Sequence, residues 1–356
     1  MSDSRRASIL GTGLIGSSVA LALKGQGWIV SGVDGDESRA REAEAAGVID
    51  AVGLDSAADL VVVAVPVSSL AAAVAAALLA CPAATVTDVG SVKAAIARRV
   101  HDPRFVGGHP MAGSEQDGLK GADATLFNGA TWVLTPTETT DANRYADLRA
   151  TIMSIGADVV ELPPERHDAL VALVSHVPHL TAATLMGLAA SQAEEHSALL
   201  RLAAGGFRDM TRIAAGHPAI WPDICVENRD AILDGLDALS DALAAVRATV
   251  AEGDRSGLLV KLEAARAARI NLPARFATAE ELVELRIPVP DRKGVLAEIT
   301  TLAGDLDVSI VDLEIAHSVE GDRGVLIVTI DALASDRVSA ALIERGYKPS
   351  ASPVGR

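Results

Sequence analysis

Residues 107–115 read GGHPMAGSE and place a histidine, a serine and a glutamate in a segment of small residues. The strand-like run RFVGG (104–108) comes directly before, so the imidazole of His109 is expected at the end of a strand. An imidazole titrates near neutral pH and can accept a proton from a hydroxyl. The segment predicts a hydrogen-bond acceptor at a strand end, followed closely by Ser114 and Glu115. A purely structural histidine is the alternative.

Three other stretches carry polar side chains that could act with this histidine. DVGSVK (88–93) places Ser91 where a predicted strand ends and a helix begins, a position that also suits a helix cap. The other two stretches lie in a helical part of the chain and carry Ser175, His176 and His179 in SHVPHL (175–180), and Arg208, Asp209, Arg212 and Trp221 in residues 205–224. Arg212 could hold a carboxylate through two parallel hydrogen bonds, which a lysine cannot do.

Structural interpretations compete with functional ones at several of these positions. A histidine on a mostly apolar helix is often satisfied by a neighbour, which leaves the roles of His176 and His179 open. Arg208 is expected to form an ion pair, with Asp209 as a candidate partner, and Trp221 is expected in the core. No metal site is predicted, because no third ligand has a matching spacing.

The segment GTGLIG, which begins at Gly11, matches the G-x-G-x-x-G pattern of dinucleotide-binding loops. A predicted strand (SIL) precedes it and a predicted helix (SSVALALKG) follows. Gly11 permits a tight turn, Gly13 lets the backbone approach a pyrophosphate, and Gly16 lets the helix pack close to the strand. The helix start, with Leu14 and Ile15, directs its positive end at the phosphates.

Asp34 ends the second predicted strand, WIVSGVD (28–34), roughly 20 residues after the loop. A carboxylate at this place bonds the ribose 2′-hydroxyl and repels a 2′-phosphate, and the nearest arginine is Arg39. The sequence therefore favours NAD over NADP. Capping of the predicted helix 36–46 suits Asp36 better than Asp34.

Strands and helices alternate in residues 1–163, which predicts a Rossmann-type, doubly wound parallel sheet of an α/β protein. Predicted strands cover 7–10, 28–34, 60–66, 84–89, 104–108 and 131–136, and predicted helices cover 14–25, 36–46, 68–80 and 91–101. The domain is expected to close near DVVELP (158–163), where Pro163 and Pro164 mark a break.

Two further domains are expected downstream. Residues 164–275 have helical periodicity and predict an all-helical domain for substrate binding and dimerisation. Residues 281–356 follow the order βαββαβ of a ferredoxin-like fold.

The composition limits the classes of protein. The 356 residues carry a formal net charge of −16, which argues against a dedicated nucleic-acid binder and against an anionic membrane surface. The longest apolar stretches are interrupted and are expected to be buried elements, not membrane spans. Cys81 and Cys225 form no CxxC pair, and no signal peptide is apparent, so a cytoplasmic protein is expected.

The four polar stretches, in this order behind GTGLIG, resemble the prephenate dehydrogenase family of tyrosine biosynthesis, which includes arogenate-using members. The final section resembles an ACT domain, a module that binds amino acids as feedback signals. Together the two resemblances cover nearly the whole chain. They imply an NAD-dependent oxidative decarboxylation of prephenate to 4-hydroxyphenylpyruvate, with arogenate as the alternative substrate.

The resemblance implies roles for individual residues. His109 would accept the proton of the ring hydroxyl, and Ser91 would bond the same hydroxyl or orient the histidine. Arg212 would bind a substrate carboxylate. Four more residues would line the substrate pocket: Ser114 and Glu115 near the entrance, and Ser175 and His179 from the helical domain.

The ACT resemblance places an amino-acid site at the turn between Asp291 and Gly294, whose amides could bind a carboxylate. Lys293 stands where many family members have proline, so tyrosine binding is open and a purely dimerising module is the alternative. A homodimer is expected. Two other classes compete with the dehydrogenase, namely another Rossmann reductase and a non-catalytic amino-acid sensor.

Overall fold

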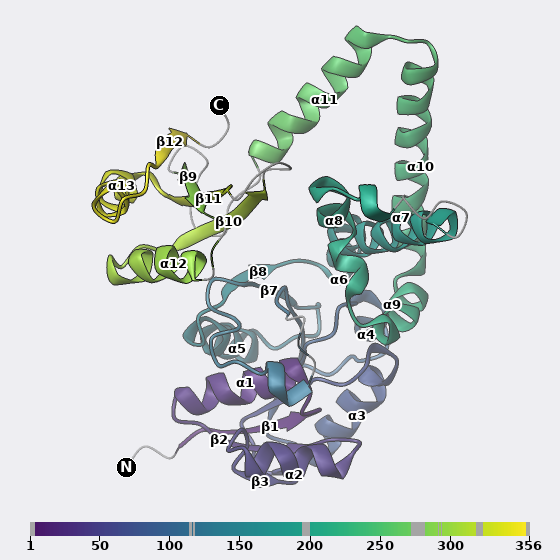
Figure 1. Ribbon diagram of the computed structural model, residues 1–356. Helices are drawn as coiled ribbons and strands as arrows, with labels where there is room; N and C mark the ends of the chain where they lie inside the picture. Colours follow the sequence, from purple (N-terminus) through teal and green to yellow (C-terminus); the bar gives the residue numbers. More distant parts are fainter. Residues whose placement is uncertain are drawn as a thin grey trace. The chain divides into compact units, whose positions relative to one another are not determined.

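The structure is a computed structural model that describes residues 4–113, 116, 118–193, 200–271, 282–290, 292, 294–317 and 323–353. Contacts divide the chain into two compact units, Met1–Leu243 and Ala244–Arg356. Each is considered by itself, with its helices and strands labelled in Figure 1.

The first unit is built on an eight-stranded sheet in the order β3-β2-β1-β4-β5-β6-β7-β8. Its strands are β1 (Arg6–Leu10), β2 (Ile29–Val33), β3 (Ala51–Val52), β4 (Leu60–Val63), β5 (Thr85–Asp88), β6 (Phe105–Pro110), β7 (Thr131–Thr135) and β8 (Asp158–Glu161). The strand order reverses between β1 and β4, which is where doubly wound sheets bind their ligands. This confirms the predicted Rossmann-type sheet.

The expectation of an entirely parallel sheet was wrong at one pairing. β7 runs antiparallel to β6, while β7 and β8 are parallel to each other. The described residues between β6 and β7 form only the short η2 (Gly118–Gly121) and no α-helix. Two parallel neighbouring strands need a crossover connection, usually a helix, whereas two antiparallel strands do not. The lack of a helix in the described part of this connection agrees with the antiparallel pairing.

Helices cover both faces of the sheet. They are α1 (Leu14–Gly25), α2 (Glu37–Ala45), α3 (Leu70–Ala80), α4 (Ala94–Ala97) and α5 (Ala142–Ser154), with a 3₁₀ turn, η1 (Val67–Ser69), before α3. Adjacent residues of a strand point to opposite faces, and accordingly Ile9 and Leu10 belong to two separate apolar clusters. The first cluster includes α1 and α5, and the second includes α3 and α4.

The helical part of this unit follows β8. It contains α6 (Pro164–Val171), a π-helical turn η3 (Ala172–His176), α7 (Val177–Ala193), η4 (Leu200–Leu202), α8 (Gly205–Thr211), η5 (Arg212–Ala215), η6 (Pro218–Ile220), α9 (Trp221–Glu227) and α10 (Arg229–Ala251), which continues past the end of the unit. The run Pro164–Gln192 is long and apolar enough to cross a membrane by length and composition alone, which is weak evidence for a span.

The second unit contains α11 (Arg255–Ile270) and a four-stranded antiparallel sheet in the order β10-β11-β9-β12. Its other elements are β9 (Leu282–Pro290), α12 (Val295–Asp305), β10 (Ile310–His317), β11 (Arg323–Asp331), η8 (Ala332–Ala334), α13 (Ser335–Glu344) and β12 (Ser350–Pro353). Leu285, Ile287 and Val289 lie on the face that α12 and α13 cover. The element order is the predicted βαββαβ.

Candidate active site

The loop between β1 and α1 has the geometry of a phosphate cradle. Gly11 has φ +99°, and a side chain there would collide with the carbonyl of Ala64 at the end of β4. A side chain on Gly16 would collide with the carbonyl oxygen of Gly11. A Cβ on Gly13 would meet nothing within 4 Å, so the loop is open at the N-terminus of α1. These features fit a pyrophosphate held by the first amides of α1, those of Leu14 and Ile15.

Asp34 lies directly after β2 and is bound to this loop. Its Oδ2 accepts hydrogen bonds from the Thr12 amide at 2.8 Å and from the Thr12 hydroxyl at 3.2 Å. Asp36 caps α2, since its Oδ1 accepts from the Ser38 amide at 3.0 Å, which confirms the expectation that Asp36 and not Asp34 caps this helix. Asp34 is thus held beside the nucleotide loop by main chain and side chain.

His109 is the fifth residue of β6, where glycines bring neighbouring groups close. A Cβ on Gly108 would lie 2.7 Å from the Asp88 carbonyl and 3.0 Å from Nε1 of Trp132. Burial holds the pKa of His109 well below its usual value of 6.5, and the neighbouring His167 and Lys93 act in the same direction. The imidazole is therefore neutral at neutral pH and can act as a base.

The main chain that carries His109 is fixed by a buried ion pair. Lys93 and Asp88 are both fully buried and in direct contact. Lys93 Nζ also donates to the Gly108 carbonyl at 2.8 Å, and Asp88 Oδ1 accepts from the Gly108 amide at 3.2 Å. Burial lowers the pKa of Lys93, although Asp88 opposes the shift. Both polar groups of Gly108 are thereby bonded, which orients the next residue.

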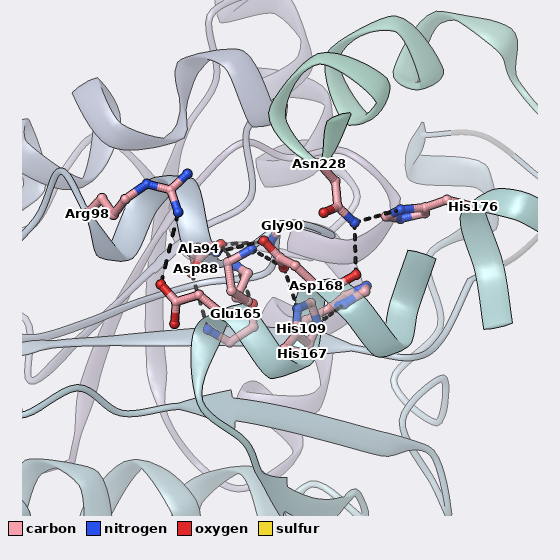
Figure 2. Close-up of polar contacts among 12 residues, drawn as sticks. Asp88, Gly90, Ala94, Arg98, His109, Glu165, His167, Asp168, His176 and Asn228 are labelled. Carbon is pink, nitrogen blue, oxygen red and sulfur yellow. Dashed lines mark hydrogen bonds and ion pairs between the residues drawn. The ribbon is translucent and has the colours of Figure 1, made fainter. Parts of the chain in front are cut away.

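The His109 ring is bonded to His167 of α6, which in turn is bonded to Asp168, and neither residue was among the sequence-based candidates. Figure 2 shows His109 beside His167 and Asp168. The two histidines are joined at 2.9 Å between Nδ1 of His109 and Nε2 of His167. His167 Nδ1 lies 2.7 Å from Oδ1 of Asp168. Both α6 side chains are buried.

Asp168 also holds the start of α4. Its Oδ1 accepts from the Lys93 amide and its Oδ2 from the Ala94 amide, each at 2.8 Å. Ser91 therefore does not cap this helix. It lies half-buried in the loop between β5 and α4, and α4 is shorter than the expected helix 91–101.

A second polar cluster joins η3, α7 and α9. Nδ2 of Asn228 donates to the Asp168 carbonyl at 3.0 Å and lies 3.1 Å from Nδ1 of His176. Burial lowers the pKa of His176 to about 4, and its buried Nε2 has no hydrogen-bond partner among the described residues. His179 stacks on Trp221 with ring centroids 3.6 Å apart. Half-buried Trp221 also packs against a small apolar cluster that includes Ala172 and Ile224, in agreement with the expected core position.

The structure places the remaining candidates as follows. Ser175 is half-buried in the π-helical turn η3, one residue before His176. Arg212 is exposed at the start of η5, which packs against α7. Arg208 donates to the Ala203 carbonyl at 3.2 Å in place of the expected ion pair. Gly294 has φ +92° and begins α12 in the second unit. Ser114, Glu115 and Asp291 lie outside the described residues.

Little in the sequence distinguishes His167 and Asp168 from ordinary surface residues. His167 and Asp168 are consecutive polar residues near the start of a helix, shortly after Pro163 and Pro164. Polar residues in the first turn of a helix are usually exposed to solvent. Only the structure shows that these two are buried and bonded to other residues.

The fold and the site together define a nicotinamide-nucleotide-dependent dehydrogenase. Residues 19–161 match the model of the prephenate dehydrogenase nucleotide-binding domain, and residues 163–264 match that of its dimerization domain. The chain is 35% identical over 346 residues to a prephenate dehydrogenase of Bacillus subtilis, covering 91% of both chains. It is 35% identical over 280 residues to a cyclohexadienyl dehydrogenase of Zymomonas mobilis, covering 74% of this chain and 95% of the other.

Two solved structures of related dehydrogenases are also similar to this chain. The prephenate dehydrogenase from A. aeolicus, determined with hydroxyphenyl propionate and NAD⁺, has a TM-score of 0.71 and 29% identity, covering 76% of this chain and 99% of the other. Synechocystis arogenate dehydrogenase has a TM-score of 0.65 and 30% identity, covering 74% and 98%. The chain belongs to the prephenate dehydrogenase family and is an NAD-dependent oxidoreductase.

Proposed function

We propose that the protein oxidises and decarboxylates prephenate to 4-hydroxyphenylpyruvate, with NAD as hydride acceptor, in tyrosine biosynthesis. The observation that carries this proposal is the neutral imidazole of His109 at the end of β6, on the same sheet as the open nucleotide loop. Relatives named prephenate dehydrogenase, at 35% and 31% identity, support prephenate as the substrate.

We assign the following roles in binding and catalysis to individual residues. NAD would be held by the loop from Gly11 to Gly16 and by Asp34, and it supplies the hydride acceptor when bound. His109 would accept the proton of the ring C4 hydroxyl as hydride leaves C4. Departure of the ring carboxylate as CO₂ makes the ring aromatic, so the reaction is strongly favourable. Ser91 would bond the same hydroxyl or orient the imidazole.

Substrate binding would come from the helical part. Arg212 would pair with a carboxylate of the dianionic substrate, and Ser175 and His179 would line the pocket. The packing of α7 against η5 and η3 supports this grouping, because these three elements carry His179, Arg212 and Ser175. Ser114 and Glu115 would contact the substrate side chain or control entry.

Arogenate is the second candidate substrate. It differs from prephenate by an amino group in place of the side-chain keto group. The similarity to Synechocystis arogenate dehydrogenase and to a cyclohexadienyl dehydrogenase favours a site that could accept it.

We further propose a homodimer formed through the helical part. Large apolar side chains are exposed there, including Leu173, Val174, Leu188 and Leu243. A second copy would cover such a surface, and it would also explain the apolar run Pro164–Gln192 without a membrane. Cys81 and Cys225 are free thiols, which supports a reducing, cytoplasmic location.

The second unit would act as an ACT domain that binds tyrosine as a feedback inhibitor. Its βαββαβ order, and the left-handed Gly294 at the start of α12, support this role. We propose that the chain has three domains: a nucleotide-binding domain (1–163), a helical domain (164–275) and the ACT domain (281–356).

NADH production at 340 nm tests these proposals together. The purified protein is mixed with NAD and either prephenate or arogenate, each with and without tyrosine. Turnover of prephenate is expected, and turnover of arogenate alone would reassign the substrate. Inhibition by tyrosine would support the ACT domain. Bound NAD without turnover of either substrate would favour the sensor or another reductase.

A further inference from the structure

We propose that His167 and Asp168 are positioning residues that fix the tautomer of His109, so that its Nδ1 carries the proton and its Nε2 remains the free acceptor. The inference rests on the proposed role of His109 as the base. Asp168 fixes the direction of every bond in this chain, because backbone amides bond its carboxylate and an amide can only donate.

Asp168 acts as an acceptor with both oxygens. Amide groups can only donate, and the Lys93 amide reaches Oδ1 while the Ala94 amide reaches Oδ2, each at 2.8 Å. Both carboxylate oxygens are therefore acceptors in these bonds. His167 Nδ1, which lies 2.7 Å from Oδ1, must therefore be the donor in their shared bond.

The direction of the next bond follows. In a neutral imidazole only one nitrogen carries a proton, so a proton on Nδ1 of His167 leaves its Nε2 as an acceptor. The atom 2.9 Å away is Nδ1 of His109, which must donate. Nε2 of His109 is then unprotonated, and this is the nitrogen that can accept the proton of a substrate hydroxyl.

The same chain would stabilise the product of proton transfer. Once protonated, His109 donates from both nitrogens, and its bond to His167 is unchanged. The Asp168 carboxylate lies one imidazole away and would offset the new positive charge in a buried setting. A doubly protonated His167 is the competing arrangement. It would force Nδ1 of His109 to accept and would place the proton on the wrong nitrogen.

The ring nitrogens can be observed directly by ¹⁵N NMR of histidine-labelled protein with NAD bound and no substrate. Protonated and unprotonated ring nitrogens have well-separated shifts. In the wild type we expect a protonated Nδ1 and an unprotonated Nε2 for His109, assigned by loss of the signal in His109→Asn. The reverse pattern would overturn the proposal whether or not the enzyme consumes prephenate.

Two substitutions test whether His167 causes this pattern. His167→Gln retains an acceptor near the position of Nε2, whereas His167→Leu fills the space without one. We expect His167→Leu to lower kcat about 10²–10⁴-fold with KM for prephenate nearly unchanged, and His167→Gln to recover much of the loss. His101→Gln, at an exposed histidine of the same unit, is the matched control and should behave as wild type.

The outcomes separate the two proposals. If the wild type turns over neither prephenate nor arogenate, the proposed function fails and the NMR result alone decides the tautomer. If the wild type is active but His167→Leu keeps its kcat, or His167→Gln is as impaired as His167→Leu while both remain folded, the positioning role is wrong. If His167→Leu does not fold, rescue and nitrogen shifts in His167→Gln decide.

Discussion

The two halves of the active site are built in different ways. The nucleotide loop consists of consecutive residues, and its shape depends on glycine backbones such as Gly11 and Gly16. His109 depends on side chains far away in sequence, because His167 is 58 residues distant and Asp168 bonds an amide 75 residues before it. Substitutions in the loop should therefore change cofactor affinity, whereas substitutions around the histidine should change the catalytic rate.

The largest effect is expected at the histidine. His109→Asn should lower kcat by about 10²–10⁴-fold, because the base is lost, while the affinity for NAD changes little. Steady-state kinetics and calorimetric titration with NAD measure the two quantities. A variant with the wild-type kcat would remove His109 from the mechanism, and a large loss of NAD affinity would contradict the separation of the two halves.

A glycine of the loop should show the opposite pattern. Gly11→Ala places a side chain at φ +99° against the Ala64 carbonyl. Strain of about 1–3 kcal/mol, if relieved only by distorting the nucleotide loop, would raise the Kd for NAD by roughly 5- to 150-fold. Gly25→Ala in α1, where a Cβ meets nothing within 4 Å, is the control. An unchanged Kd in Gly11→Ala would show that the loop tolerates a side chain.

The next effect concerns cofactor choice. Asp34→Ala should weaken NAD about 10-fold and reduce discrimination against NADP, since the carboxylate no longer repels a 2′-phosphate. Asp36→Ala, which removes only the cap of α2, should leave the NAD/NADP ratio unchanged. Equal responses of the two cofactors to Asp34→Ala would place Asp34 away from the ribose.

The smallest effect is expected from mild acid. An ordinary histidine is half protonated at pH 6.5, but burial holds the pKa of His109 well below that value. The active, neutral form should persist, so kcat/KM should remain near its plateau at pH 6.5 and fall only at lower pH. A pH profile at constant ionic strength measures the acid limb, and a midpoint at 6.5 or higher would contradict the shift.

Local features of the sequence were predictable because neighbouring residues decide them. α1 spans 14–25 as expected, and the loop before it has the left-handed glycine that its pattern predicts. The βαββαβ order of the second unit also followed from periodicity alone. The reversed direction of β7 did not, because a strand's residues are the same whether its neighbour runs parallel or antiparallel.

Contacts across long separations were not predictable. His167 and Asp168 look like the exposed polar residues of an ordinary first turn, and Ser91 looks like the natural cap for the helix behind it. In the structure Asp168 takes over that cap. Nothing in the local sequence indicates that Asp168 replaces Ser91 as the cap, since this depends on the packing of α6 beside α4.

The sequence by itself predicted the nucleotide loop, Asp34 as the residue that favours NAD, and His109 as the candidate base, because each prediction depends on residue types at short spacing. Only the tertiary structure decided which side chains hold that base. His109 contacts His167, and through it Asp168, because β6 and α6 fold together and these buried polar atoms bond to one another.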